Sequence, residues 1–170
     1  MFGIDPTIVV HEIPTYPGAK PVRQRLHPMH PRKAATIKVE VEKFLKAGFI
    51  YPIPLMDWVS SIILIAEKQG TICVCVDYWD INCVCPKDNY PTPFINQIIY
   101  ECVGTENFSF MDEFSGYNHI NISPTDQHKT TFICAWGTFI YKKLPFGLNN
   151  VGATFQWEIS YAFHDIRHII

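Results

Sequence analysis

The stretch KTTFICAWGTFIYKKLPFGLNNVGATFQ, residues 129–156, contains two apolar runs that flank Trp136-Gly137. Two such runs around a glycine-containing turn predict a β-hairpin. After PFGLNN comes VGATFQWEISYAFHDI, residues 151–166, whose length and apolar content predict a helix. The stretch therefore predicts a hairpin that leads through a short loop into a helix.

A second hairpin is predicted upstream, in SSIILIAEKQGTICVCVDY, residues 60–78. A Gln-Gly turn separates its two apolar runs. PFINQIIYECV, residues 93–103, predicts a short helix that opens at Pro93 and ends before Gly104. NFSFMDEF, residues 107–114, predicts a strand that ends at Asp112. Strands and helices alternate with short hairpins, so the predicted class is α+β.

HPRKAATIKVEVEKFLKAGFI, residues 30–50, carries a proline at a first helical position, Pro31, and a stop signal, Gly48. Because Val39 and Val41 alternate with charged residues, a strand is the competing interpretation. Length and end signals favour a helix. One of its faces would hold Ile37, Val41, Phe44 and Leu45.

The 170 residues, 48% apolar and 14% aromatic, indicate one packed globular domain. Residues 1–30 are proline-rich and predict an extended leader lying on the body, or a partly disordered one. We find no signal peptide and no run long enough to cross a membrane, which favours an intracellular, cytoplasmic or nuclear protein. In that setting the six cysteines are expected to be reduced thiols.

Four cysteines form two Cys-x-Cys pairs in TICVCVDYWDINCVCPKD, residues 71–88. Cys73 and Cys75 would share one strand face, so both could ligate a metal. The one-residue spacing within each pair is shorter than that of the usual zinc knuckle. A zinc module stays an alternative that metal analysis would test, but we expect no zinc site.

Asp112 is the best candidate for chemistry, because a carboxylate at the end of an apolar strand leaves the core and can hold a divalent cation. An ordinary strand-end or helix-capping aspartate is the simpler alternative.

The motifs FSFMDEFSGYNHINI, residues 108–122, and the stretch 129–156, in this order and spacing, resemble the palm of a reverse transcriptase of the gypsy-type LTR retrotransposons. VCVDYWDIN, residues 74–82, resembles the fingers strand of that family. The resemblance covers nearly the whole chain. It implies a right-hand fold with a leader at 1–30, fingers at 31–90 and an incomplete palm at 91–170.

The resemblance implies RNA-directed DNA polymerase chemistry, in which two Mg²⁺ ions activate the primer 3′-hydroxyl and the leaving pyrophosphate. The implied partners are an RNA template, a DNA primer and a dNTP. Asp112 would be one of three metal-holding carboxylates, and the backbone carbonyl of Glu113 would assist it. Tyr117 matches the steric gate that rejects ribonucleotides. Three further residues match the surface beneath the incoming nucleotide and template base: Phe146, Gly147 and Gln156.

Departures from the family pattern occur in both the fingers and the palm. The family usually has arginines at the positions of Cys73 and Trp79 and a basic cluster around 66–68, of which Lys68 alone remains. The Tyr-x-Asp-Asp hairpin that carries the other two aspartates is absent from the 170 residues. We therefore expect a polymerase fragment truncated before that motif and inactive by itself.

A non-catalytic RNA- or DNA-binding relic is the alternative. Residues 1–46 hold eight Lys and Arg against four Asp and Glu, and the remaining residues hold six against twelve. A basic first third could bind phosphates, although the acidic remainder counts against it.

Overall fold

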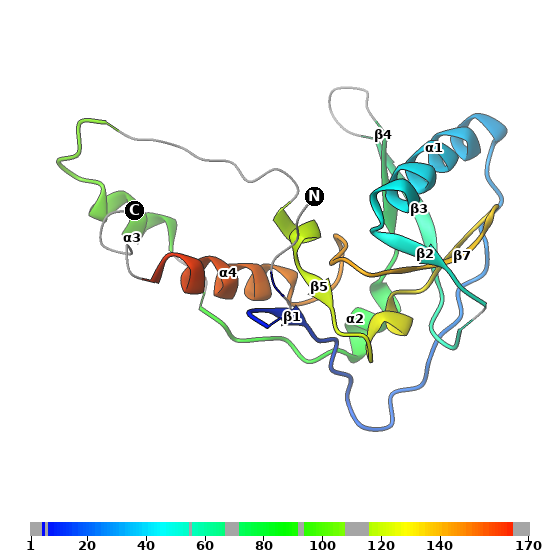
Figure 1. Ribbon diagram of the computed structural model, residues 1–170, viewed down its shortest axis with the longest axis horizontal. Coiled ribbons are helices and arrows are strands. Elements are labelled where there is room, and N and C mark those ends of the chain that lie inside the picture. The colour runs from blue at the N-terminus through cyan, green and yellow to red at the C-terminus, as the bar shows by residue number, and fades with distance from the viewer. Residues whose placement is uncertain are drawn as a thin grey trace.

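The larger of two sheets has five strands in the order β2-β7-β6-β3-β4. The computed structural model describes residues 5, 7–54, 56–66, 72–91, 94–107 and 116–164. Figure 1 shows the sheet and the first long helix at one end of an elongated molecule. The strands are β2 (Ile50–Pro52), β3 (Ser60–Ala66), β4 (Ile72–Val76), β6 (Phe132–Cys134) and β7 (Gly137–Tyr141).

Both predicted hairpins are confirmed. β3 and β4 are antiparallel, with Ile62 opposite Val76 at the end nearest the core. β6 and β7 are also antiparallel, and Cys134 lies opposite Gly137 at the predicted turn. Gly137 has a positive φ of 139°, which a residue without Cβ adopts at little cost. Together with the helices described below, the hairpins confirm the α+β class.

The two hairpins are joined by a parallel pairing between β3 and β6, in which Ser60 lies opposite Phe132 and Ser61 opposite Ile133. β2 then adds to the outer side of β7. Strands from both sides of residue 91 therefore belong to one sheet. The predicted boundary between fingers at 31–90 and palm at 91–170 does not coincide with an edge of this sheet, and that division stays a prediction.

Helix α1 (Pro31–Ala47) contacts β2 and β4. It begins at Pro31 and ends directly before Gly48, whose φ is 73°, as the end signals predicted. Ile37 and Val41 are buried, and the ring of Phe44 lies 6.1 Å from that of Tyr141. The alternative of a strand at this position is wrong, because the apolar residues follow the helical period.

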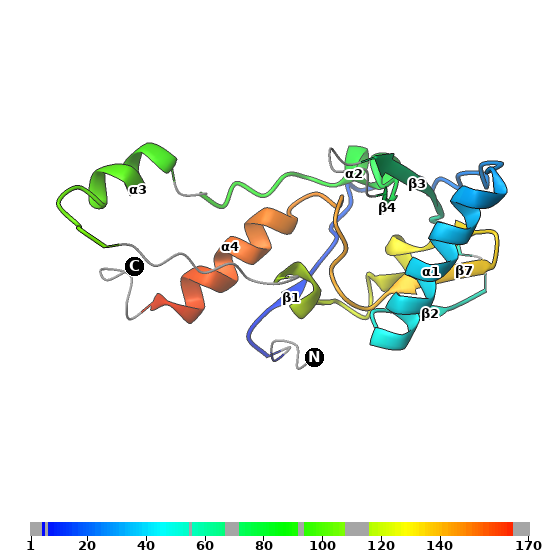
Figure 2. The same cartoon turned by 90° about the horizontal axis from the view of Figure 1, so that it is seen from above.

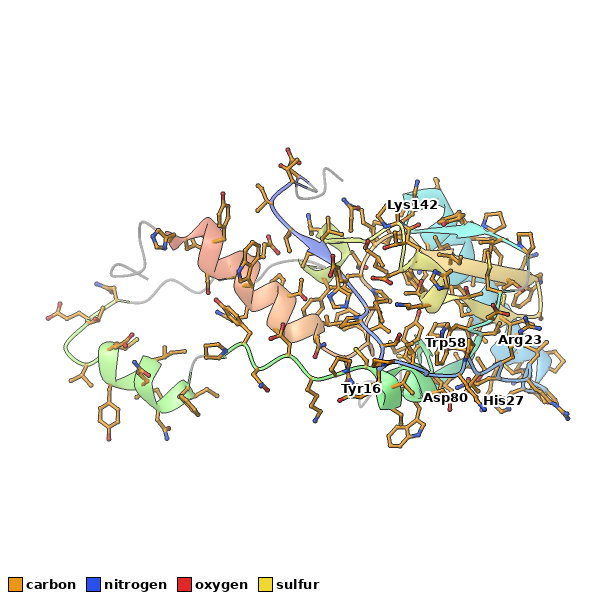
Figure 3. All side chains as sticks on the ribbon, turned by 90° about the horizontal axis from the view of Figure 1, so that it is seen from below. Tyr16, Arg23, His27, Trp58, Asp80 and Lys142 are labelled. Carbon is orange, nitrogen blue, oxygen red and sulfur yellow. The ribbon has the colours of Figure 1, made fainter. Side chains whose placement is uncertain are left out.

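Residues 7–30 run extended along the body. β1 (Val10–His11) pairs in parallel with β5 (Asn121–Ile122). Farther along, Gln24 holds the leader to the sheet: its Oε1 accepts from the Ser61 amide at 2.7 Å and its Nε2 donates to Asp80 at 2.8 Å. Figure 3 shows this course from Tyr16 past Asp80 toward His27.

The remaining helices lie outside the sheet: α2 (Trp79–Val84), α3 (Ile95–Glu101), α4 (Val151–Ala162) and the 3-10 turns η1 (Gly116–His119) and η2 (Gln127–Thr130). Figure 2 shows α4 beyond the sheet and α3 farther still. The strand expected to end at Asp112 falls in 108–115, outside the described residues. Within the described part of the chain, no helix is both long and apolar enough for a membrane span.

Asn82 on α2 connects that helix to the loop before α4. Its Nδ2 donates to the Gly147 carbonyl at 2.7 Å, and its Oδ1 accepts from the Asn149 amide at 2.8 Å. A third bond runs from the Asn149 side-chain amide to the Asn82 carbonyl at 2.9 Å. Three hydrogen bonds thus tie residues 82 and 147–149, far apart in sequence, into one unit.

Replacing Asn82 with alanine should lower the free energy of unfolding by about 1–3 kcal/mol, because two backbone groups lose their partners. The loss of stability in Asn82→Asp should lie between that of wild type and that of Asn82→Ala, since aspartate keeps the acceptor for the Asn149 amide but not the donor to the Gly147 carbonyl. Asn89→Ala, at an exposed site, is the control and should change stability by less than about 0.5 kcal/mol. Urea denaturation measures all three, and equal effects of Asn82→Ala and Asn89→Ala would contradict the connection.

His11 is a buried titratable group, 2% exposed, whose Nδ1 lies 2.8 Å from the Thr154 hydroxyl on α4. Burial lowers the pKa of His11 from 6.5 to about 4, and this desolvation outweighs the opposing effects of Asp126 and Asp88. Because the folded pKa lies below the unfolded one, the unfolded chain takes up the proton first as the pH falls. His11 therefore stabilises the fold fully above pH 6.5 and loses that contribution down to about pH 4.

From these pKa values, wild-type protein should lose about 2 kcal/mol through His11 between about pH 7 and pH 5. His11→Gln removes the titration and should show a shallower fall in stability over that range. His27→Gln, at an exposed leader position, should keep the wild-type slope. Denaturant midpoints across the pH range give the comparison. Parallel slopes for His11→Gln and wild type would show that His11 is not buried in its neutral form.

Candidate functional site

Three aromatic rings meet between η1, the loop after β7, and α4. Tyr117 lies edge-on to Phe146 with ring centroids 4.9 Å apart, and edge-on to Phe155 at 5.0 Å. Tyr117 and Phe155 are half-buried against the core, whereas Phe146 is 62% exposed. Edge-to-face packing on both sides fixes the Tyr117 ring. We call these three residues the aromatic shelf.

Gly147 brings the loop that carries the shelf against the end of β4. Its φ is 98°, a conformation that favours glycine. A Cβ at this position would lie 3.5 Å from the Val76 carbonyl oxygen and 3.6 Å from the Tyr78 ring. The hydrogen bond from Asn82 to the Gly147 carbonyl holds the loop there. The shelf is therefore anchored to the β3–β4 hairpin.

Lys143 adds a positive charge next to η1. Its Nζ donates to the His119 carbonyl at 3.3 Å. Partial burial lowers the pKa of Lys143, and the neighbouring Lys142 lowers it further. At the next residue, the Leu144 amide donates to the Ile120 carbonyl at 3.0 Å, which keeps this segment beside η1.

Gln156 lies on α4 directly after Phe155 and is half-buried. It is the fourth predicted substrate-contacting residue within the described part of the chain. The structure therefore brings Tyr117 and Phe146 into contact, with Gly147 and Gln156 adjacent in sequence to shelf residues. These positions are consistent with one surface, but the roles assigned to the residues stay predictions.

Asp112 and Glu113 lie in 108–115, and Lys68 lies in 67–71, so all three predicted residues fall outside the described part of the chain. Among the described residues, no three His, Cys, Asp or Glu side chains lie close enough together to bind a metal ion.

Sequence reasoning missed the residues that hold the loops together. Asn150, with a φ of 65°, accepts from the Asp88 amide and donates to the Pro86 carbonyl. An asparagine directly before a predicted helix is the signal that could have found it. His11 carried no such signal, since nothing in a proline-rich leader predicts burial.

A pocket of about 280 Å³ lies between the leader and α4. Its lining residues are Ile8, Val9, Val10, Asp88, Tyr90, Ala153, Thr154 and Trp157. None of the predicted site residues lines it, and its polar groups are too few and too open to define a reaction.

No family model matches the chain. By sequence it is similar to polyproteins of fission yeast, Schizosaccharomyces pombe. It is 30% identical to the transposon Tf2-3 polyprotein over 136 residues, 80% of this chain and 10% of the polyprotein. It is 28% identical to the transposon Tf2-7 polyprotein over 148 residues, 86% of this chain and 11% of the polyprotein. The chain thus spans about a tenth of the length of these relatives.

By structure the chain is similar to the protease-reverse transcriptase of prototype foamy virus. The native crystal structure matches with a TM-score of 0.79 and 20% identity, covering 93% of this chain and 21% of the viral one. The foamy viral enzyme in complex with an RNA/DNA hybrid matches with a TM-score of 0.77 and 18% identity, over 95% of this chain and 21% of that one. By sequence the chain is therefore similar to retrotransposon polyproteins, and its fold matches part of the fold of the foamy viral protease-reverse transcriptase, which confirms the resemblance to a reverse transcriptase inferred from its motifs.

Proposed function

We propose that these residues form the fingers and the first part of the palm of an RNA-directed DNA polymerase that copies a retrotransposon transcript. The observation that carries the proposal is that sequence and fold agree over most of the chain: the polyprotein similarity covers 80% of it and the similarity to the reverse transcriptase fold 93%. The structural neighbours include complexes with an RNA/DNA hybrid and with double-stranded DNA, which supports nucleic acid as the partner.

In this proposal the aromatic shelf receives the sugar of the incoming dNTP. Tyr117 is held between two rings, so it cannot swing aside without breaking both contacts. A ribose 2′-hydroxyl directed at that ring would collide with it, whereas a deoxyribose would not. Phe146 and Gly147 would support the nucleotide from the loop, and Gln156 would lie under the template base.

Reverse transcriptases depend on a divalent metal, and in this chain Asp112 with the Glu113 carbonyl would hold Mg²⁺. Their oxygen atoms are the ligands that Mg²⁺ prefers. The described residues hold no cluster of three possible metal ligands, so we derive no step of the reaction through the ion. When bound, Mg²⁺ would lower the charge on the triphosphate and activate the primer hydroxyl.

In this proposal the fingers bind the triphosphate of the dNTP weakly, because they lack cationic side chains. Cys73 and Trp79 stand where the family usually has arginines; the thiol is half-buried and the indole is 71% exposed. Neither side chain can neutralise a phosphate. The 170 residues contain one of the family's three catalytic aspartates. We therefore propose that this stretch does not extend primers by itself.

The alternative of a non-catalytic RNA- or DNA-binding protein rests on the basic first third, and the structure weakens it. Arg23 pairs with Asp57 at 2.7 Å, and Lys43 pairs with Glu40 at 2.7 Å. Lys38 also lies 3.9 Å from Glu42. These exposed pairs contribute little stability, but they cancel part of the positive charge that phosphates would need.

A chimeric polymerase tests whether the fingers segment of this chain binds the triphosphate weakly, independently of the rest of the chain. Residues 60–85 replace the matching segment of the Tf2-3 polyprotein, and primer extension on an RNA template is measured. The graft should reduce extension by on the order of 10²-fold or more, because two cationic contacts to the triphosphate are lost. The same graft with Cys73→Arg and Trp79→Arg should recover most of the loss.

Two controls distinguish a loss of triphosphate binding from misfolding of the graft. A graft with Cys83→Arg places the charge on the exposed side of α2 and should recover nothing. A graft of residues 129–156 should retain activity, because Phe146, Gly147 and Gln156 match the family. Full activity of the first graft, or no recovery with both arginines, would contradict the proposal.

A further inference from the structure

Two thiols lie side by side on the outer strand of the sheet. Cys73 and Cys75 are half-buried on β4, with their Sγ atoms 3.4 Å apart. They lie opposite Ile65 and Ile63 of β3, which are 48% and 38% exposed. Side chains opposite one another in a sheet share a face, so the thiols belong to a face that solvent reaches.

A direct disulfide between these cysteines does not suit a strand. Residues two apart in a strand have Cα atoms about 6.6–6.8 Å apart. That separation is at the upper end of the range that disulfides span. Closing the sulfur atoms from 3.4 Å to about 2.05 Å would shorten β4 and disturb its pairing with β3.

A single atom that bridges the two sulfurs fits better. With bonds of about 2.3 Å, as thiolate makes to zinc, sulfurs 3.4 Å apart subtend an angle of about 95° at the bridging atom. A tetrahedral zinc ion would need the sulfurs about 3.8 Å apart and two further ligands. The described residues offer no third His, Cys, Asp or Glu near the pair. A pyramidal trivalent centre, with angles little above a right angle, needs only the two thiols.

We propose that Cys73 and Cys75 form a bidentate site for trivalent arsenic, either arsenite or a mono-organic arsenical. Each thiol proton leaves with an oxygen substituent of arsenic as water, and two As–S bonds form. Arsenic stays trivalent, so no oxidant or reductant is needed. Its third substituent, a hydroxyl or an organic group, would point to solvent past Ile63 and Ile65.

The other Cys-x-Cys pair is a matched comparison within the same chain. Cys83 is exposed on α2, whereas Cys85 is buried and its Sγ lies 3.6 Å from the Pro86 carbonyl. Burial raises the pKa of the Cys85 thiol, which makes its thiolate scarcer. The same spacing in sequence thus has two results. Cys73 and Cys75 share one strand face, whereas Cys83 is exposed and Cys85 is buried.

Phenylarsine oxide is the probe, added to the reduced full chain and followed by intact mass spectrometry. Wild type should gain one phenylarsine oxide less one water, and the adduct should survive excess glutathione but not a dithiol such as dimercaptopropanol. Because the second As–S bond forms within the molecule, release by a monothiol should be slower by on the order of 10²-fold or more than from a single thiol.

Cys73→Ser and Cys75→Ser should each lose the glutathione-resistant adduct, whereas Cys83→Ser and Cys85→Ser should keep it. Peptide mapping of wild type tests the assignment without any variant: after arsenical treatment, maleimide should label Cys83 but neither Cys73 nor Cys75. A resistant adduct that survives Cys73→Ser or Cys75→Ser, or maleimide labelling of both strand thiols, would overturn the proposal.

Discussion

The parallel pairing of β3 with β6 is the contact on which the rest of the arrangement depends. The Ser60 amide of β3 donates to the Thr131 carbonyl directly before β6 at 2.9 Å. On the β4 side of the same strand, the Asp77 amide donates to the Ser61 carbonyl at 2.9 Å. The polar groups enclosed at this junction are satisfied: the Thr131 hydroxyl, for example, donates to the His128 carbonyl at 2.6 Å. A buried junction of this kind is stable because none of these groups loses its partner.

From this junction the positions of the site residues follow. With β6 beside β3, the next strand β7 directs the chain back across the sheet, and the loop after it reaches the end of β4. Gly147 then packs against Val76 and Tyr78, and Phe146 meets Tyr117. A change of register between β3 and β6 would displace the aromatic shelf, even though none of its residues lies in either strand.

The local elements could be predicted because their signals are local. Pro31 and Gly48 mark the ends of α1, and Gly137 marks the second hairpin, whatever the rest of the chain does. The β3–β6 and β1–β5 pairings could not be predicted, because parallel partners far apart in sequence leave no periodic pattern that identifies them.

For the candidate site as well, the sequence identified individual residues but not the contacts that depend on the fold. Motif resemblance identified Tyr117, Phe146 and Gly147, and it identified Cys73 as a departure from the family. It could not show that Asn82 holds the Gly147 loop, because that contact depends on folding. Nor could it give the separation of the Cys73 and Cys75 sulfur atoms, on which the proposed bridging site rests.

Native-state amide hydrogen exchange across the two hairpins tests the central claim most directly. If the β3–β6 junction unites them, the amides of Ser60 and Tyr141 should exchange with the same, highest opening free energy, because both open when the sheet opens as a whole. Protection of β3 and β4 with rapid exchange throughout 130–141 would show that the second hairpin is not held by the first, and would contradict the account of the site.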